Sequence, residues 1–273
     1  MSLPLPTSLT PSKVSAFKDC ALAFRFAVID RLPEPPSAPA VRGTLVHRAL
    51  ELLFDQPAPG RTRAEAGACL RQARADLAED PEMVGLELDD EAAESMEAEA
   101  ASLLDRYFTL EDPRRIQPVD TELLLEVEVG SLRLRGIIDR LERDGDGGLV
   151  VTDYKTGRAP GVAFERSRLG GVHFYAYLCE QALGERPSRV QLLYLADPVA
   201  IVAHPTEQSI RGLRQRTAAV WKAVERACER EDFRPHPGPL CNWCAFQAYC
   251  PAFGGEVARA AEAGLAAGVT AGP

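Results

Sequence analysis

The stretch Arg135-Gly136-Ile137-Ile138-Asp139-Arg140 is followed, after an acidic, glycine-rich turn, by Val150-Val151-Thr152-Asp153-Tyr154-Lys155-Thr156-Gly157. Alternation of apolar and polar residues predicts that both are β-strands. Because successive side chains of a strand point to opposite faces, Asp153 and Lys155 share one face. Asp139, near the end of the preceding strand, can bring a second carboxylate alongside them. The two stretches therefore predict a sheet that carries two acids and one lysine close together.

Two carboxylates and one ammonium group on a rigid sheet suit the hydrolysis of phosphodiester bonds. Mg²⁺ and Mn²⁺ prefer oxygen ligands, usually carboxylates together with waters and substrate phosphate, so Asp139 and Asp153 predict part of a metal site with open positions. The metal lowers the pKa of a bound water. Lys155 can orient that nucleophile or stabilise negative charge on the phosphate. These residues predict a metal-dependent nuclease.

The Asp-x-Lys triplet at residues 153–155 is weak evidence by itself. With four lysines and 40 acidic residues in the chain, about 0.6 such triplets are expected by chance. The ordinary alternative is a solvated salt bridge on an edge strand. The scarcity of lysine argues the other way, because arginine supplies nearly all the other positive charge. The choice of lysine at position 155 therefore favours a chemical role.

The composition predicts a globular protein. A chain of 273 residues with 46% hydrophobic content can form one large domain or two small ones. No stretch approaches about 18 uncharged apolar residues, and the first residues lack the features of a signal peptide, so we expect a cytoplasmic protein that does not span a membrane.

The net charge of −9 argues against indiscriminate coating of nucleic acid, so any contact with DNA needs a local basic patch. Two runs of arginines are candidates, although each can equally be a solvated helix face. They are Arg61, Arg63, Arg71 and Arg74, and Arg211, Arg214 and Arg216.

Seven cysteines in an intracellular chain do not predict a disulfide framework. Three lie in helical patterns and are expected to be small buried side chains: Cys69, Cys179 and Cys228. The other four are a compact C-x2-C-x5-C run at Cys241, Cys244 and Cys250, and Cys20 near the N-terminus. Four thiolates suit Zn²⁺ or an iron–sulfur cluster, with a disulfide or inert thiols as the alternative. Ligation by Cys20 would close a loop of more than 200 residues.

The remaining patterns predict an order of helix, three strands, helix and strand. Thr10 and Pro11 predict the start of an N-terminal helix, and a proline-rich linker covers Pro33 to Pro39. The next helix runs from Gly43 to Phe54 and carries His47, which can be structural or pair with Glu51. The later elements are helices at 62–79, 90–108, 167–183 and 207–229, strands at 121–129, 131–142, 149–156 and 189–195, and a flexible Ala/Gly-rich tail at 256–273. This order predicts an α/β fold with a mixed sheet and helices on its faces.

The order of elements and three motifs resemble the RecB-like branch of the PD-(D/E)XK nuclease superfamily. The motifs are Gly-x-x-Asp-Arg at Asp139, Asp-Tyr-Lys-Thr-Gly from Asp153, and Gly-x-x-x-His at His47. The resemblance covers nearly the whole chain and implies a restriction-endonuclease-like core in one domain over residues 1–255, with a helical insertion at about 56–115. The metal ligands that it implies are His47, Asp139, Asp153 and the backbone carbonyl of Tyr154. The catalytic residues that it implies are His47, Asp139, Asp153 and Lys155.

The split cysteine pattern resembles the iron–sulfur nucleases of the same branch, among them the AddB nuclease domain and the CRISPR-associated single-domain nucleases. In those proteins one cysteine precedes the nuclease core and three follow it, as Cys20 and the segment 241–250 do here. The resemblance favours a 4Fe–4S cluster over structural Zn²⁺. One motif departs from the family, whose Gln-x-x-x-Tyr becomes His173-Phe174-Tyr175-Ala176-Tyr177. His173 and Tyr177 are the candidates for contact with DNA, although Tyr175 and Tyr177 can instead pack the helix.

The resemblance implies a DNA exonuclease that uses Mg²⁺ or Mn²⁺ and acts on single-stranded DNA or DNA ends in repair or recombination. The chain has no Walker-type Gly-x-x-x-x-Gly-Lys-Ser/Thr motif, so we expect no intrinsic ATPase and a nuclease that acts alone or serves a separate helicase or recombination partner. Two alternatives stay open. One is a CRISPR-adaptation nuclease that trims integration substrates, and the other is a non-catalytic iron–sulfur module that binds DNA. The complete set of acids, histidine and lysine argues against the second.

Overall fold

The computed structural model describes residues 2–161 and 165–266. The chain divides into two compact units. Unit 1 combines Met1–Pro35, Glu126–Arg135 and Arg211–Pro273, and unit 2 combines Pro36–Leu125 and Gly136–Ile210. One continuous nuclease domain over residues 1–255 stays a prediction. Within the described residues, no helix is both long enough and apolar enough to cross a membrane.

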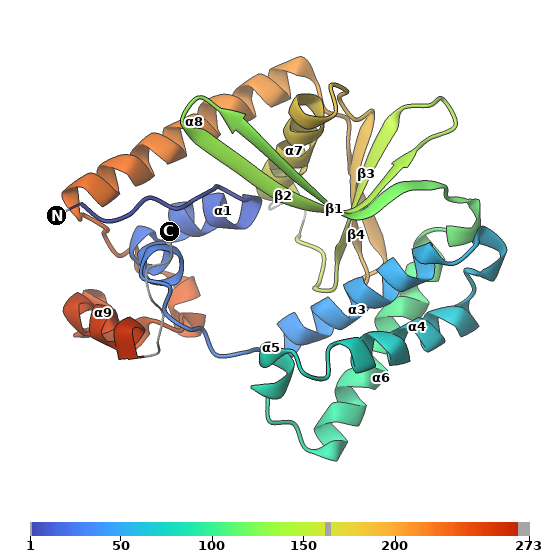
Figure 1. The fold of residues 1–273 in the computed structure, drawn as a ribbon, viewed down its shortest axis with the longest axis horizontal. Helices are drawn as coiled ribbons and strands as arrows, with labels where there is room; N and C mark the ends of the chain where they lie inside the picture. The colour runs from blue at the N-terminus through green and yellow to red at the C-terminus, as the bar shows by residue number, and fades with distance from the viewer. Residues whose placement is uncertain (1, 162–164, 267–273) are drawn as a thin grey trace. The chain divides into compact units, whose positions relative to one another are not determined.

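Most of a five-stranded sheet lies in unit 2, with the strands side by side in the order β1-β2-β3-β4-β5 (Figure 1). The strands are β1 (Pro118–Val129), β2 (Leu132–Arg143), β3 (Leu149–Lys155), β4 (Arg189–Tyr194) and β5 (Val199–Ala203). Strands β3 and β4 are parallel, whereas β2 with β3 and β4 with β5 are antiparallel. The α/β fold with a mixed sheet is confirmed. The edge strand β5 is an addition that the sequence did not predict.

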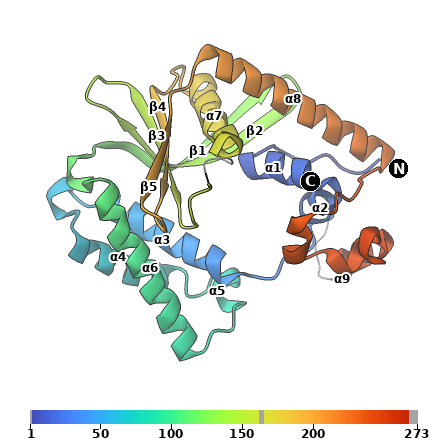
Figure 2. The ribbon, with the colours of Figure 1, turned by 180° about the vertical axis from the view of Figure 1, so that it is seen from behind.

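Three helices of unit 2 cover one face of the sheet (Figure 2). They are α3 (Ala38–Asp55), α4 (Arg63–Asp76) and α6 (Asp90–Leu110), with the short elements η2 (Ala58–Gly60), α5 (Pro81–Val84) and η3 (Pro113–Arg115) between and after them. Val46 and Leu50 of α3 pack in one core with Tyr154 and Leu193 of the sheet. This packing buries the apolar stripe of α3 and so fixes the helix that carries His47 against the strands.

Helix α3 begins at Ala38, and not at the predicted Gly43. Ser37 caps the helix, because its hydroxyl accepts a 3.4 Å hydrogen bond from the amide of Ala40. Pro39 stands in the first turn, where a backbone N–H would have no helical partner and proline therefore costs nothing. The predicted linker therefore extended too far, because its last residues, Ala38 and Pro39, belong to the first turn of the helix.

Helix α7 (Glu165–Ala182) covers the opposite face and forms the crossover between the parallel strands β3 and β4. It lies so close to β2 that a Cβ at Gly136 would be 2.7 Å from Leu178 Cδ1 and 3.2 Å from Tyr175 Cε1. A residue with a Cβ would force these two side chains to shift, so glycine lets Leu178 and Tyr175 of α7 pack directly against β2.

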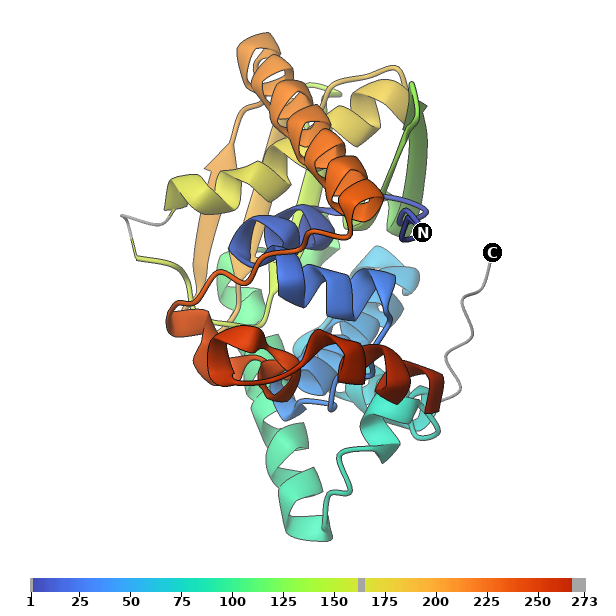
Figure 3. The ribbon, with the colours of Figure 1, turned by 90° about the vertical axis from the view of Figure 1, so that its left-hand side faces the viewer.

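Unit 1 brings together segments from the beginning and the end of the chain. Figure 3 shows the N-terminal helices, in blue, beside the C-terminal segment, in red. The elements are α1 (Pro11–Asp19), α2 (Ala21–Phe24), the π-helical turn η1 (Arg25–Ile29), most of α8 (Glu207–Arg230), η5 (Pro239–Trp243), η6 (Gln247–Tyr249), η7 (Pro251–Phe253) and α9 (Val257–Ala266). Thr10 caps α1, and proline is its first residue, as predicted. Phe26 packs with Val224 and Phe246 in a core of its own.

Helix α9 occupies much of the region that the sequence predicted to be a flexible tail. Alanine has the highest helix propensity, and Ala260 is fully buried in the core of unit 1. Packing therefore orders a segment whose composition alone suggested fraying. Residues 267–273 of the predicted tail lie outside the described residues.

The arginine run at residues 61–74 is mainly structural. Arg61 is 6% exposed and donates hydrogen bonds to four backbone carbonyls, those of Phe54, Gln56, Pro113 and Ile116. Two further arginines form ion pairs with acids of α6, Arg63 with Asp105 and Arg74 with Glu97. Arg71 is exposed. Most of this run is therefore committed to contacts within unit 2.

Replacing Arg61 by alanine is expected to lower the free energy of unfolding by about 2–4 kcal/mol, because it leaves several carbonyls without a donor. The matched control is Arg71→Ala, which removes an exposed guanidinium from the same run and should change stability by less than about 0.5 kcal/mol. Urea unfolding followed by circular dichroism measures both. Equal midpoints for the two variants would contradict the structural role of Arg61.

Candidate active site

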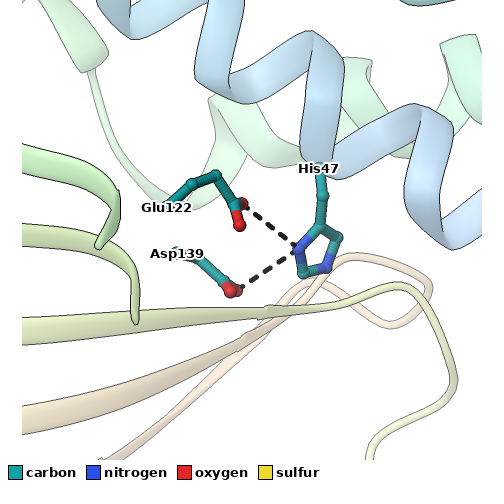
Figure 4. Close-up of side chains that lie close together, drawn as sticks. All are labelled: His47, Glu122 and Asp139. Atoms are coloured by element: carbon teal, nitrogen blue, oxygen red, sulfur yellow. Dashed lines mark ion pairs between the residues drawn. The ribbon is translucent and has the colours of Figure 1, made fainter. Parts of the chain in front are cut away.

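Three side chains from three elements gather at the sheet: His47 from α3, Glu122 from β1 and Asp139 from β2 (Figure 4). One possible ligand atom from each lies within 4.8 Å of the other two. His47 Nδ1 is 3.5 Å from Asp139 Oδ2 and 4.0 Å from Glu122 Oε1. An imidazole nitrogen and two carboxylates are donors that Mg²⁺ and Mn²⁺ sites use. The residues present therefore fit a divalent cation.

The second ring nitrogen of His47, Nε2, lies 3.1 Å from the backbone carbonyl oxygen of Tyr154. At this distance Nε2–H can donate a hydrogen bond to the carbonyl, which leaves Nδ1, the nitrogen that faces the two acids, available to bind a metal. Burial lowers the pKa of His47 and outweighs the Asp153 carboxylate, which raises it. The ring is therefore neutral at neutral pH. A neutral imidazole is the form that binds metal. The structure brings these two predicted ligands together.

Asp139 is almost buried, and its Oδ2 accepts a 2.6 Å hydrogen bond from the backbone amide of Tyr154. Arg140 of β2 pairs with Thr152 of β3 in an antiparallel register. The next residues along the two strands, Asp139 and Asp153, therefore lie opposite each other. Burial, followed by the charge of Asp153, raises the pKa of Asp139 well above its usual value. The two carboxylates thus lie alongside each other, as the period of the strands predicted.

Asp153 is buried and forms an ion pair with Lys155, two residues further along the same face of β3. Burial lowers the pKa of Lys155, but the charge of Asp153 and the hydrogen bond to it outweigh this effect and raise the pKa. The lysine is therefore a permanent ammonium, and its side chain is still 43% exposed. Tyr175 of α7 also forms a side-chain hydrogen bond with Asp153.

Glu122 is the site residue that the sequence did not predict. Its φ is +48°, in the left-handed region that costs residues other than glycine about 1–2 kcal/mol. Burial, followed by the charges of Glu51 and Asp153, raises the pKa of Glu122 to about 7. In the sequence, Glu122, Glu126 and Glu128 have the even spacing that puts side chains on one face of a strand, as expected for a solvated face. No local signal distinguishes it from them.

Arg140 is fully buried beside Asp139 in the chain and organises Tyr154. Its guanidinium donates to the hydroxyl of Tyr154 at 2.6 Å, to Thr152 Oγ1 at 3.1 Å and to Glu142 Oε2 at 2.6 Å. It also forms an ion pair with Glu111. These bonds fix the tyrosine ring and so hold the peptide group whose N–H binds Asp139 and whose carbonyl faces His47.

Tyr177 is buried on α7, with 3% of its surface exposed, so its ring packs within unit 2. This burial agrees with the alternative of an aromatic residue that packs the helix. Contact of Tyr177 with DNA stays a prediction. Tyr175, two residues earlier, is the tyrosine that reaches the acids. For His173, contact with DNA stays a prediction.

The four predicted cysteine ligands line one cavity of about 510 Å³ in unit 1. The amide of His236 donates to Cys20 Sγ at 3.4 Å, and the amide of Gly238 donates to Cys241 Sγ at 3.4 Å. Such N–H···S bonds are typical around metal-bound thiolates. An iron–sulfur cluster in this cavity stays a prediction. The remaining cysteines are buried, as expected: Cys69, Cys179 and Cys228.

Comparisons with known proteins identify the fold and its family. The profile of the PD-(D/E)XK nuclease superfamily matches residues 8–251. The Gene 69 protein of Mycobacterium phage L5 is 31% identical over 135 residues, which are 48% of this chain and 44% of the phage protein. This chain thus spans less than half the length of that relative.

Among solved structures, a protein of Eubacterium rectale described as a candidate exonuclease aligns with a TM-score of 0.53. The alignment covers 87% of this chain and 86% of the other at 11% sequence identity, so it shows a shared fold. The family profile extends over most of the chain, from before α1 to the last of the four cysteines. The chain therefore belongs to the PD-(D/E)XK nuclease superfamily.

Proposed function

We propose that this nuclease is a metal-dependent DNA exonuclease of the RecB-like branch, which hydrolyses single-stranded DNA or DNA ends in repair or recombination. The observation that carries the proposal is the convergence of His47, Glu122 and Asp139 next to the Asp153–Lys155 ion pair. The RecB-like assignment is supported by Gly136 of the Gly-x-x-Asp-Arg motif, which lies against side chains of α7, and by the histidine on α3. A structural neighbour described as an exonuclease supports end-directed cleavage.

The residues divide the chemical work between them. His47, Glu122 and Asp139, with Asp153 and the Tyr154 carbonyl, would hold Mg²⁺ or Mn²⁺, which when bound lowers the pKa of water and offsets phosphate charge. Asp139 and Asp153 are buried, so solvent screens their charges little. Lys155 keeps a charged ammonium partly in solvent, where it can meet the negative charge of a phosphodiester.

Replacing Lys155 by alanine is expected to reduce degradation of single-stranded DNA in Mn²⁺ by about 10²–10³-fold, the loss typical when one transition-state donor is removed. Lys222→Ala, which removes an exposed lysine on α8, is the matched control and should degrade DNA at the wild-type rate. Release of acid-soluble nucleotides measures both. A wild type that degrades no DNA, or a Lys155→Ala protein as active as wild type, would sink the proposal.

The affinity for Mn²⁺ is expected to rise between about pH 5 and pH 8. A carboxyl must lose its proton to bind metal, and the pKa of Glu122 is raised to about 7, so protons compete below that pH and cease to compete above it. Glu122→Gln should weaken binding at pH 8 and flatten the dependence, leaving the part due to Asp139. Calorimetric titration measures the affinity. Equal binding at pH 5 and 8 would contradict a role for Glu122 as a ligand.

We propose that the cysteine cavity holds a 4Fe–4S cluster that fastens unit 1. Anaerobically purified protein should be brown, and Cys244→Ser should lose the visible absorbance and lower the unfolding temperature. Cys179→Ala is the control for the absorbance and should keep the brown colour, because Cys179 is buried away from the cysteine cavity. A colourless wild type that contains zinc would contradict the cluster and indicate structural Zn²⁺ instead.

A further inference from the structure

A second cavity, of about 490 Å³, opens in unit 2 beside the candidate active site. Three arginines line it, Arg42 of α3, Arg106 of α6 and Arg158 of the segment after β3, together with Thr156. We call this cavity the arginine cleft. Its lining also includes two acids, Glu99 and Asp197, so three positive charges face two negative ones.

The arginine cleft adjoins the catalytic residues along two elements. Thr156 follows Lys155 directly, at the end of β3. Arg42 precedes His47 on α3 by about one and a half turns. The two elements approach each other closely here, because a Cβ on Gly43 would lie 3.2 Å from Thr156 Oγ1. Gly43 lies about one helical turn before His47, so the edge of the cleft at Thr156 lies about one turn of α3 from the active site.

The arginines keep unused hydrogen-bonding capacity. Among the described residues, Arg158 is exposed and forms no ion pair or hydrogen bond. Arg106 donates one bond, of 2.6 Å, to the carbonyl of Ala196, which leaves its other N–H groups available. Arg42 forms an ion pair with Glu99, yet its Nε is buried with no hydrogen-bond partner in the described structure. Arg106 and Arg158 therefore carry the N–H groups that a ligand in the cleft can reach.

The two acids do not cancel this positive character. Glu99 is neutralised by Arg42, and Asp197 accepts a 3.2 Å hydrogen bond from the backbone amide of Ala159. The hydrogen bond between Ala159 and Asp197 connects the segment after β3 to the loop after β4 and so orders the backbone that carries Arg158. Three arginines against two acids leave the cleft with one net positive charge, and Arg106 and Arg158 are its arginines without an ion pair among the described residues.

We propose that the arginine cleft binds a phosphate group of the nucleic-acid strand whose neighbouring phosphodiester lies at the active site. The planar forks of arginine match phosphate oxygens, and phosphate contacts fix the position of a strand without reading its sequence. This inference rests on the proposed function. The phosphate is either the terminal phosphate of the strand or an internal one, and both offer the same oxygens to the arginines.

The test measures binding of fluorescent single-stranded oligonucleotides by the Lys155→Ala protein, which prevents degradation. Adding Arg158→Ala or Arg106→Ala should weaken binding about tenfold each. It should also reduce the slope of log affinity against log salt by about 0.7 per lost phosphate contact. Arg158→Lys should keep the slope but lose part of the affinity, because the charge remains and the fork does not. Lys222→Ala, which removes an exposed cation on α8, is the control and should bind like its parent.

Three oligonucleotides identify the source of the phosphate: one with a 5′-phosphate, one with a 5′-hydroxyl and a 3′-phosphate, and a closed circle. If Arg158→Ala weakens binding of only one linear oligonucleotide, the cleft holds that terminal phosphate. If it weakens binding of all three equally, the cleft holds an internal phosphate. Unchanged affinity and unchanged salt slope for both arginine variants would overturn the proposal.

The experiment separates this inference from the proposed function. If the wild type degrades the oligonucleotides and the arginine variants bind and degrade them equally well, the cleft proposal fails and the nuclease proposal stands. If the wild type neither binds nor degrades DNA, both fail. Because Arg158 is exposed, its variants should unfold at the wild-type urea midpoint, which confirms that any loss is one of binding.

Discussion

Asp139 and Asp153 come next to each other on paired strands, and burial places both where like charges repel strongly. The peptide group of Tyr154 makes this arrangement possible. Its N–H binds Asp139, its carbonyl faces His47, and its ring is held by the buried guanidinium of Arg140. One residue of β3 thus connects the second acid, the helix histidine and the buried ionic network. The rest of the site is arranged around it.

Local signals in the sequence located the strands and the chemistry that they carry. Strand β3 was predicted at 149–156 and found at Leu149–Lys155, because an apolar run with period-two alternation is a strong local pattern. The same pattern placed Asp153 and Lys155 on one face. The capped start of α1 at Thr10 followed from a side-chain bond within three residues. Features that depend on neighbours in the sequence were therefore predictable.

The features that the sequence did not predict depend on contacts between distant segments. Glu122 enters the site through an unusual backbone angle and the packing of α3, neither of which has a local pattern. Tyr175 reaches Asp153 because Gly136, on another strand, lets α7 approach. The edge strand β5 is only five residues long and follows a turn at residues 195–198, so its signal was too short. Tertiary geometry selected these residues.

The division of unit 1 into three separated stretches has a consequence for protein synthesis. Unit 2 is complete once residue 210 has been translated. The cavity that Cys20 and Cys250 line forms only with the last stretch of the chain. At roughly 5–20 residues per second, the thiol of Cys20 waits on the order of 10–50 s for its partners. During that interval it is a free thiol on a growing chain, open to oxidation. A ribosome that stops before Cys241 releases His47, Glu122, Asp139 and Lys155 together, but without the segment that closes unit 1.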